Sequence, residues 1–424
     1  MFEMDLPYDK KTLHLRLEDK NFAGVLTGKQ SDYPAPEDQA ALIEAALDNP
    51  IGLPRLEELA AGKRNVVIIC SDHTRPGSKL ITPALLRRIR SASPDARIRL
   101  LIATGSHRTT TAEEILSKFG PEIAGREEII VHDARDEDNL VEIGTLPSGG
   151  RCVINRIAAE ADLLVAEGFI EAHFFAGFSG GRKSVLPGVS SYDTIRANHC
   201  GPSLADPNTR TGNLEGNVVH RDMVYAARAA KLAFILNVVM NGEKKFIGAF
   251  AGDMERAHEA GCNFLRSLVC VKKVPCDVAV VTNGGYPLDQ NMYQTTKAMA
   301  TADALLPEGG VVILVAGCRD GHGGQDFYDN VAHAESPAAF LERAAHTPYT
   351  DTAPEQWTSQ ILARTLARHP MIFVSDLVDP GLISGLHMSL AKTLDEALEM
   401  AYAIKGPDAR VAVVPNGPGV VVEG

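Results

Sequence analysis

The sequence lacks any run of about 18 consecutive apolar residues, the length that a helix needs to cross a membrane. Its first ten residues, MFEMDLPYDK, are acidic and polar, unlike the apolar core of a signal peptide. From these two absences we expect a cytoplasmic protein without membrane contact.

Paired cysteines and excess positive charge are also missing. The seven cysteines are dispersed and include no C-x-x-C pair, which favours reduced thiols over a disulfide framework. Lys and Arg number 42 against 54 Asp and Glu, so the formal net charge is -12. This balance argues against a nucleic-acid surface, and an anionic ligand would need a local basic pocket.

Motifs of several common enzyme classes are absent or misplaced. No G-x-G-x-x-G turn follows the first buried strand, where CSDHTRPG stands, so a nicotinamide dehydrogenase is disfavoured. In GGRKS, Arg182 occupies the position where a Walker A loop requires glycine. GFSGG fits the bare G-x-S-x-G pattern around Ser179, but it does not directly follow a strand as a nucleophile elbow does. No standard histidine or cysteine metal motif is present.

Short runs rich in Val, Ile and Leu alternate with helical patterns along the chain, which is typical of parallel sheets covered on both faces. The expected strands of the first series are 64–72, 97–108, 126–134, 161–169 and 232–240. Those of the second series are 277–285, 309–318, 369–376 and 409–417.

We therefore predict an α/β protein with two domains, each a mostly parallel sheet flanked by helices. A chain of 424 residues is too long for one typical domain. Charges and a proline interrupt the pattern at 270–277. The expected division is an N-terminal domain of residues 1–272 and a C-terminal domain of residues 273–406. The last strand, within 407–424, either closes the second sheet or crosses back to the first domain.

Polar clusters follow five of the expected strands. They occupy 71–76, 104–108, 167–188, 282–297 and 317–326. Ligands of open α/β sheets bind beyond the carboxyl ends of the strands. We expect one active site in the cleft between the two domains.

The segment 167–188, EGFIEAHFFAGFSGGRKSVLPG, is the most informative of these clusters. Its phenylalanines are too apolar for a solvated loop, and its glycines permit close approach or positive φ. Arg182 and Lys183 put two cations beside backbone N–H groups, which suits a phosphate or carboxylate. The segment is typical of a pocket wall for an anionic ligand, although a glycine-rich turn over a core is the alternative.

Individual residues also have ordinary structural explanations. Asp72 can cap the helix that follows it, and a single strand-end histidine such as His107 is often only a surface residue. Tyr293 and Lys297 lie four residues apart, which places them on one helix face but is common on surfaces. The convergence of several such residues favours a site.

Taken together, five motifs of this chain resemble those of the lactate racemase family, whose members use a nickel-pincer nucleotide. The motifs are SDHTRP (71–76), ATGSHR (103–108), EAHFFAGFSGGRKSVLPG (171–188), NHC (198–200) and NMYQTTK (291–297). The likeness extends from DLPYDK near the start of the chain to Trp357, and the central motif is highly specific.

The resemblance implies a cofactor, pyridinium-3,5-bisthiocarboxylic acid mononucleotide carrying nickel. Lys183 matches the lysine that holds one arm as a thioamide, and His199 matches the histidine that binds the metal. Soft sulfur with one imidazole in a planar site suits nickel. The positions implied to hold the nucleotide are Asp72, Thr74, Gly177, Gly180 and Gly181.

The resemblance also implies inversion of the α-carbon of a 2-hydroxy acid. His107 and His173 match the paired acid–base histidines, which exchange the hydroxyl proton while the α-hydrogen moves as hydride. The positions implied to bind the substrate are Arg75, Tyr293, Gln294, Lys297 and Trp357. Lactate or a related small 2-hydroxy acid is the expected substrate.

The alternative is a non-catalytic anion- or nucleotide-binding α/β protein with two domains. It would keep the cleft but lose Lys183, His199 or one of the two acid–base histidines. All four residues are present, which favours an enzyme. The resemblance further implies that cofactor-biosynthesis enzymes are partners of this protein.

Overall fold

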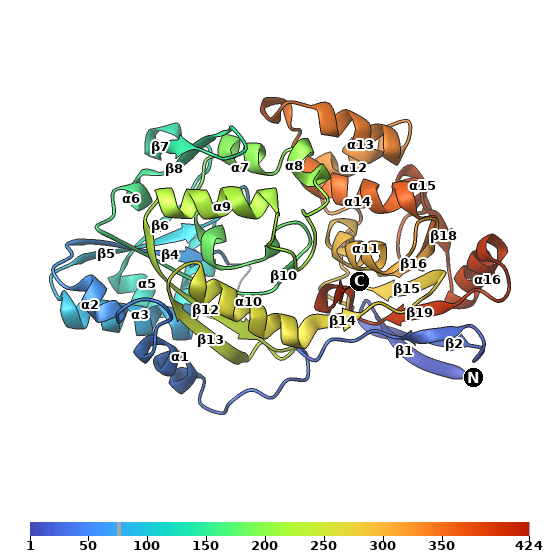
Figure 1. The fold of residues 1–424 in the computed structure, drawn as a ribbon, viewed down its shortest axis with the longest axis horizontal. Coiled ribbons are helices and arrows are strands. Elements are labelled where there is room, and N and C mark those ends of the chain that lie inside the picture. The colour runs from blue at the N-terminus through green and yellow to red at the C-terminus, as the bar shows by residue number, and fades with distance from the viewer. Residues whose placement is uncertain (74–77, 424) are drawn as a thin grey trace.

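The computed structural model describes residues 1–73 and 78–423 and contains two α/β domains (Figure 1). Within these residues the first sheet has the strand order β13-β12-β9-β4-β5-β6, and only β12 and β13 are antiparallel neighbours. Its strands are β4 (Asn65–Ser71), β5 (Arg97–Ala103), β6 (Glu128–Val131), β9 (Leu163–Phe169), β12 (Leu232–Met240) and β13 (Phe246–Gly252).

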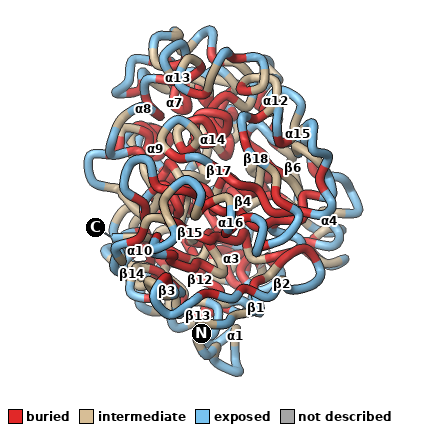
Figure 2. Tube along the Cα trace, turned by 90° about the vertical axis from the view of Figure 1, so that its right-hand side faces the viewer, coloured by how far each residue is buried: buried red, intermediate tan, exposed pale blue. Residues whose placement is uncertain are grey.

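Helices cover both faces of this sheet, which explains why most positions of β4, β9 and β12 are apolar and buried (red in Figure 2). On β4, Val66 and Ile68 pack against one set of helices, while Val67 and Ile69 pack against the other. The first set is α1 (Gln39–Asp48), α2 (Leu56–Ala60) and α3 (Ser78–Ala92). The second set includes α6 (Arg156–Ala159), α7 (Tyr192–Asn198) and α9 (Val218–Ala229).

The second sheet is parallel throughout its described strands, in the order β18-β17-β16-β15-β19-β3. Its strands are β3 (Phe22–Val25), β15 (Val278–Thr282), β16 (Val311–Val315), β17 (Met371–Val374), β18 (Ser389–Ala391) and β19 (Val411–Val414). One face is covered by α11 (Met292–Leu305), α12 (Gln325–Ala332), α13 (Pro337–His346) and α14 (Gln356–Arg368). The two sheets confirm the predicted fold class.

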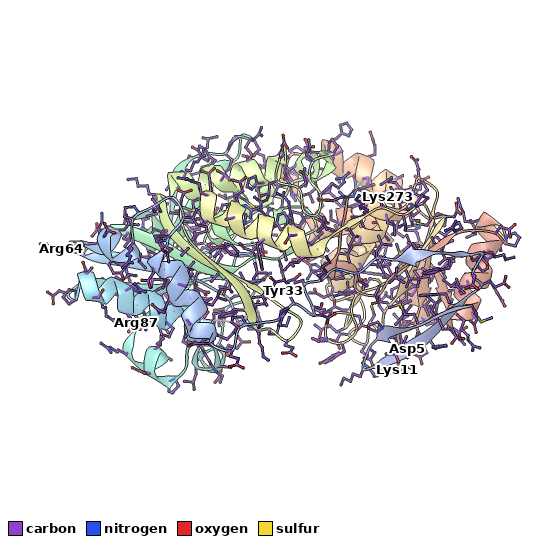
Figure 3. All side chains as sticks on the ribbon, turned by 60° about the horizontal axis from the view of Figure 1, so that its bottom comes forward. Asp5, Lys11, Tyr33, Arg64, Arg87 and Lys273 are labelled. Carbon is purple, nitrogen blue, oxygen red and sulfur yellow. The ribbon has the colours of Figure 1, made fainter. Side chains whose placement is uncertain are left out.

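The two ends of the chain are placed differently from the expected division. The N-terminal hairpin of β1 (Phe2–Tyr8) and β2 (Lys11–Leu17) packs with α16 (Leu394–Lys405) on the other face of the second sheet. Figure 3 shows Asp5 and Lys11 of this hairpin at the opposite end of the molecule from Arg64 and Arg87. Strand β3 also pairs with β19, so the first 25 residues lie with the second domain.

The last strands take both of the expected routes. Strand β19 lies inside the second sheet, between β15 and β3. Strand β20 (Val421–Glu423) pairs with β14 (Cys270–Lys272), and Val421 packs in a cluster with Ile170 and Phe178 of the first domain. The chain therefore closes the second sheet and then touches the first domain.

The remaining helices and strands pack around these two sheets. They are α4 (Ala112–Phe119), α5 (Pro121–Arg126), α8 (Gly201–Ala205), α10 (Arg256–Val269), α15 (Pro380–Gly385), β7 (Leu140–Thr145), β8 (Arg151–Asn155), β10 (Ala172–His173) and β11 (Gly177–Phe178). Within the described part of the chain, no helix is both long and apolar enough to span a membrane. All seven cysteines are free thiols, and six of them are buried.

Helix α8 of the first domain packs against α13 and α14 of the second. Gly201 allows this close approach, because a Cβ atom there would collide with the carbonyl oxygen of Ala344 in α13. The side chain of Gln360 in α14 donates a hydrogen bond of 3.3 Å to the carbonyl oxygen of Gly201. Gly201 lies two residues after His199, so this contact positions the second domain beside that histidine.

We expect Gly201→Ala to destabilise the protein by about 1–3 kcal/mol, because the new methyl group overpacks the contact between the domains. The matched control is Gly125→Ala in α5, where a Cβ atom would meet nothing within 4 Å. The control should stabilise by roughly 0.5–1 kcal/mol, because alanine suits a helix better than glycine. Urea unfolding of both variants checks this, and equal midpoints would contradict the proposed close approach.

Candidate active site

Three neighbouring strands of the first sheet carry polar residues at their carboxyl ends. Asp72 follows β4, His107 follows β5, and His173 follows β9. Nδ1 of His107 lies 2.8 Å from Oδ2 of Asp72. Asp72 is buried, whereas the side chain of His107 is 60% exposed. Asp72 therefore fixes the orientation of the His107 ring, and Nε2 of His107 is the nitrogen left for other partners.

His173 lies in the short hairpin of β10 and β11. The backbone N–H of Ala176 donates to its Nδ1 at 3.2 Å, and its Nε2 lies 3.4 Å from Nζ of Lys183. Its ring stacks on Phe174 and meets Phe175 edge-on. The backbone therefore directs Nε2 of His173 toward Lys183.

His199 is the residue that ends α7, and it is 4% exposed. Its ring meets Phe175 of the first domain and Trp357 of the second edge-on, with centroid distances of 4.9 and 5.6 Å. Among the described residues, Nδ1 of His199 has no hydrogen-bond partner although it is buried. A buried imidazole nitrogen without a partner is unusual and is available to bind a ligand or metal.

Burial lowers the pKa of both His173 and His199 well below the usual value of 6.5. The positive charge of Lys183 lowers both pKa values further, and Lys297 contributes to the shift of His173. Both imidazoles are therefore neutral at neutral pH, with a lone pair that can accept a proton or bind a metal.

The second domain brings four of the predicted residues to the same region. Tyr293, Gln294 and Lys297 lie in the first turns of α11, and Trp357 lies at the start of α14. Nζ of Lys297 donates to Oε1 of Gln294 at 3.0 Å. The contact of Trp357 with His199 and the effect of Lys297 on His173 connect this group with the first domain.

Sequence reasoning did not identify Glu355, which precedes α14. Its φ of 56° is rare for a residue other than glycine and is typical of functional sites. Burial raises the pKa of its carboxyl group, while a hydrogen bond with Tyr293 and the charge of His107 lower it. A single glutamate in a loop carries no spacing signal, so only the fold shows that it lies near these groups.

Several backbone N–H groups of the glycine-rich loop already donate hydrogen bonds within the protein. Gly177 and Gly181 have φ values of 76° and 53°, as the sequence suggested. The N–H groups of Ser179 and Gly181 already donate to Glu171 and Asn237. A phosphate on this loop would need other donors, so the nucleotide contacts of Gly177, Gly180 and Gly181 stay predictions.

Two other residues of this loop are fully engaged within the protein. The hydroxyl of Ser179 donates to the carbonyl oxygen of Phe169 and accepts from the N–H of Glu171, so it is not arranged as a nucleophile. Arg182 is 1% exposed and its guanidinium contacts loop carbonyl groups and two histidines. The expectation that Arg182 faces an anionic ligand is therefore wrong.

Two predicted residues, Thr74 and Arg75, lie outside the described residues.

A cavity of about 830 Å³ lies behind the loop and is lined by Arg182, His220, His258 and the strand 421–423. Its lining includes neither Lys183 nor the three histidines of the candidate site. In residues 1–73 and 78–423, no group of three or more His, Cys, Asp or Glu side chains is arranged to hold a metal.

We expect the stability of the protein to fall as the pH drops below 6.5. The unfolded chain then protonates histidines that the native state keeps neutral, so it binds more protons and is favoured. Each such histidine costs about 1.4 kcal/mol per pH unit below that value. Thermal unfolding at pH 7.5 and 5.5 should show a smaller loss for His173→Gln/His199→Gln than for the wild type. The exposed His333→Gln variant is the control, and an equal loss in all three proteins would contradict the explanation.

Two family models match the chain. The model "Lactate racemase N-terminal domain" matches residues 8–212, and "Lactate racemase C-terminal domain" matches residues 271–422. The lactate racemase of Lactiplantibacillus plantarum is 58% identical over 424 residues, which is 100% of both chains. That of Thermoanaerobacterium thermosaccharolyticum is 47% identical over 423 residues, covering 100% of this chain and 99% of the relative.

Solved structures agree with this match. The structure of the lactate racemase apoprotein from Thermoanaerobacterium thermosaccharolyticum has a TM-score of 0.95 and 46% identity, with 100% of both chains covered. A crystal structure of a Thermotoga maritima protein has a TM-score of 0.65 at 18% identity, covering 92% of this chain and 100% of that chain, and shows the fold alone. The chain therefore belongs to the lactate racemase family, and it is a racemase.

Proposed function

We propose that this racemase inverts the α-carbon of lactate or a related small 2-hydroxy acid at a site between its two domains. The main support is that residues of both domains lie together. His173 and Lys183 of the first domain are adjacent, and Lys297 of the second lowers the pKa of His173. The ring of His199 contacts Trp357 of the second domain. The names of the two relatives, both lactate racemases, support this substrate class. Because the chain is a racemase, the alternative of a non-catalytic anion- or nucleotide-binding protein is excluded.

The residues present fit a nickel-pincer nucleotide. Nδ1 of His199 is buried without a protein partner among the described residues, which suits a metal ligand. Lys183 would hold the group covalently, and its Nζ lies beside His173. When bound, the group supplies reversible hydride acceptance, which no side chain can provide. Because such a nucleotide has to be made elsewhere, cofactor-biosynthesis enzymes are expected partners.

The two histidines move the hydroxyl proton of the substrate. His107 uses Nε2, because Asp72 occupies its Nδ1. His173 is held neutral by burial and nearby cations. It accepts the hydroxyl proton at Nε2 in the tautomer that carries the ring hydrogen on Nδ1. One histidine serves each enantiomer, because the hydroxyl group points to opposite sides in the two. In this proposal Asp72 orients His107, and its nucleotide contact, like that of Thr74, stays a prediction.

Residues of the second domain hold the substrate. Lys297 is a cation suited to a carboxylate, as is Arg75 of the first domain, and Gln294 is fixed by its hydrogen bond from Lys297. Tyr293 and Trp357 supply aromatic surface that excludes water from the reacting carbon. The phenol of Tyr293, whose pKa is raised by burial, stays protonated and is hydrogen-bonded to Glu355.

We expect racemisation of 2-deuterated lactate by cofactor-loaded enzyme to retain deuterium at the α-carbon. A hydride that leaves and returns does not mix with solvent protons, whereas removal as a proton would lead to exchange. Mass spectrometry of the product, with optical purity followed in parallel, checks this. Racemisation of 2-deuterated 2-hydroxybutyrate should be slower but should also retain deuterium at the α-carbon. Loss of deuterium to water would refute the mechanism.

Separate replacement of His107 and His173 by alanine should each lower racemisation by about 10²–10⁴-fold, the usual contribution of general acid–base catalysis. Nickel content should stay at the wild-type level, because neither residue is proposed to bind the metal. His333→Ala, at an exposed position, is the matched control and should keep full activity. Full activity in either site variant would remove that histidine from its role.

A further inference from the structure

Arg182 lies inside the protein beside the two residues on which the proposed function depends. Its Nη1 donates to the carbonyl oxygens of Phe178 at 2.7 Å and Gly180 at 3.2 Å. Its Nη2 donates to the carbonyl oxygen of Ala176 at 2.7 Å. One planar guanidinium therefore holds three carbonyl groups of the loop 176–180, which leads directly to Lys183.

Two histidines complete this arrangement from behind. Nε of Arg182 donates to Nδ1 of His220 at 2.9 Å. Nε2 of His258 lies 2.8 Å from the carbonyl oxygen of Ser179, a fourth carbonyl of the same loop. Burial lowers the pKa of His220 to about 3 and that of His258 well below its usual value, so both rings are neutral. Within residues 1–73 and 78–423, the polar contacts of Arg182 are with carbonyl groups and histidine rings, and none is an ion pair with a carboxylate.

An uncompensated buried cation is costly, and burial lowers the pKa of Arg182 to about 10. Four of its five N–H groups are directed at protein acceptors. A direct role in binding an anion would therefore require breaking this arrangement. Hydrogen bonds to the loop carbonyl groups offset the free-energy cost of burying this charge. A smaller or uncharged side chain could not bind all of these carbonyls.

The loop transmits this arrangement to His173. The carbonyl oxygen of Ala176 accepts from Arg182, and the N–H of the same residue donates to Nδ1 of His173 at 3.2 Å. Lys183 follows Arg182 in the chain, and its N–H donates to the carbonyl oxygen of Gly180. Both sides of the 3.4 Å approach between His173 and Lys183 are thus fixed by residues that Arg182 holds.

We propose that Arg182 is a positioning residue that holds the loop 176–180, so that Nε2 of His173 and Nζ of Lys183 face each other. This inference rests on the proposed roles of His173 and Lys183, and Arg182 acts only through them. The cavity of about 830 Å³ behind the loop is lined by Arg182, His220 and His258. It gives solvent a route to the space that a shortened side chain would leave.

The test uses Arg182→Ala and Arg182→Lys, with Arg266→Ala as the matched control. Arg266 lines the same cavity and lies 5.0 Å from the ring centroid of Phe178, but its backbone hydrogen bond goes to Gly212, so it donates to none of the loop carbonyls that Arg182 holds. In cofactor-loaded enzyme, Arg182→Ala should lower kcat on the order of 10²-fold with little change in KM, the cost of a misplaced reacting group. Non-denaturing guanidinium should restore much of kcat, whereas methylammonium, with the same charge but another shape, should not. Arg182→Lys should lie between Arg182→Ala and the wild type, because an ammonium cannot reach all three carbonyls.

A second measurement needs no cofactor. In apo-protein the N–H of Ala176 donates to Nδ1, so neutral His173 rests as the Nε2–H tautomer, which ¹⁵N-labelled histidine reports. Uptake of a substrate proton at Nε2 requires the ring hydrogen to move to Nδ1. Arg182→Ala should show mixed tautomers that guanidinium reverses, while Arg266→Ala keeps the wild-type signal. The His173→Gln variant assigns the resonance. Because Arg182→Lys keeps a buried cation, it allows the same measurement if Arg182→Ala does not fold.

The outcomes separate the two proposals. Wild-type enzyme made with the cofactor-producing enzymes should carry an adduct on Lys183 by intact mass, and its absence would count against the proposed function, not against the loop. Unchanged kcat together with an unchanged His173 signal in Arg182→Ala would overturn the positioning role. Loss of kcat without guanidinium rescue and without a tautomer change would overturn it as well.

Discussion

The contact of α8 with α13 and α14 is the constraint on which the proposed site depends. The residue before α8 is Cys200, and the one before that is His199, whose ring touches Trp357 of the second domain. Gly201 lets the two domains approach more closely than any side chain would allow. Residues that are separated by more than a hundred positions in the sequence thereby enclose one buried imidazole.

Around that contact, cations surround imidazoles that stay neutral. Lys183, Lys297 and Arg182 all lower the pKa of His173, and burial acts in the same direction. The same positive surroundings suit an anionic 2-hydroxy acid, so one charge arrangement favours substrate binding and a proton-accepting histidine together. Asp72 gives His107 a different environment, with a carboxylate behind a half-exposed ring. The two proposed acid–base groups are therefore not equivalent.

The sequence predicted the elements that local patterns determine. Strands such as β4 and β9 are mostly apolar because helices cover both faces, and polar residues after them belong to the candidate site. Pairings between distant segments had no such signal. Strand β3 has only four residues, and only its register with β19 reveals its domain. Arg182 beside Lys183 suggested an anion site, because nothing local showed that loop carbonyls would surround its guanidinium.

The N-terminal residues that complete the second sheet give the molecule two covalent connections between its domains. The first runs through residues 26–38 from β3 to α1, and the second through the end of α10 into β14 (Figure 1). They run side by side, since the N–H of Lys29 donates to the carbonyl oxygen of Leu268 at 2.6 Å. Paired links of this kind resist twisting and sliding and leave rotation about their common line as the softest motion. Such a rotation would separate the faces that meet at α8 while the linked side stays together.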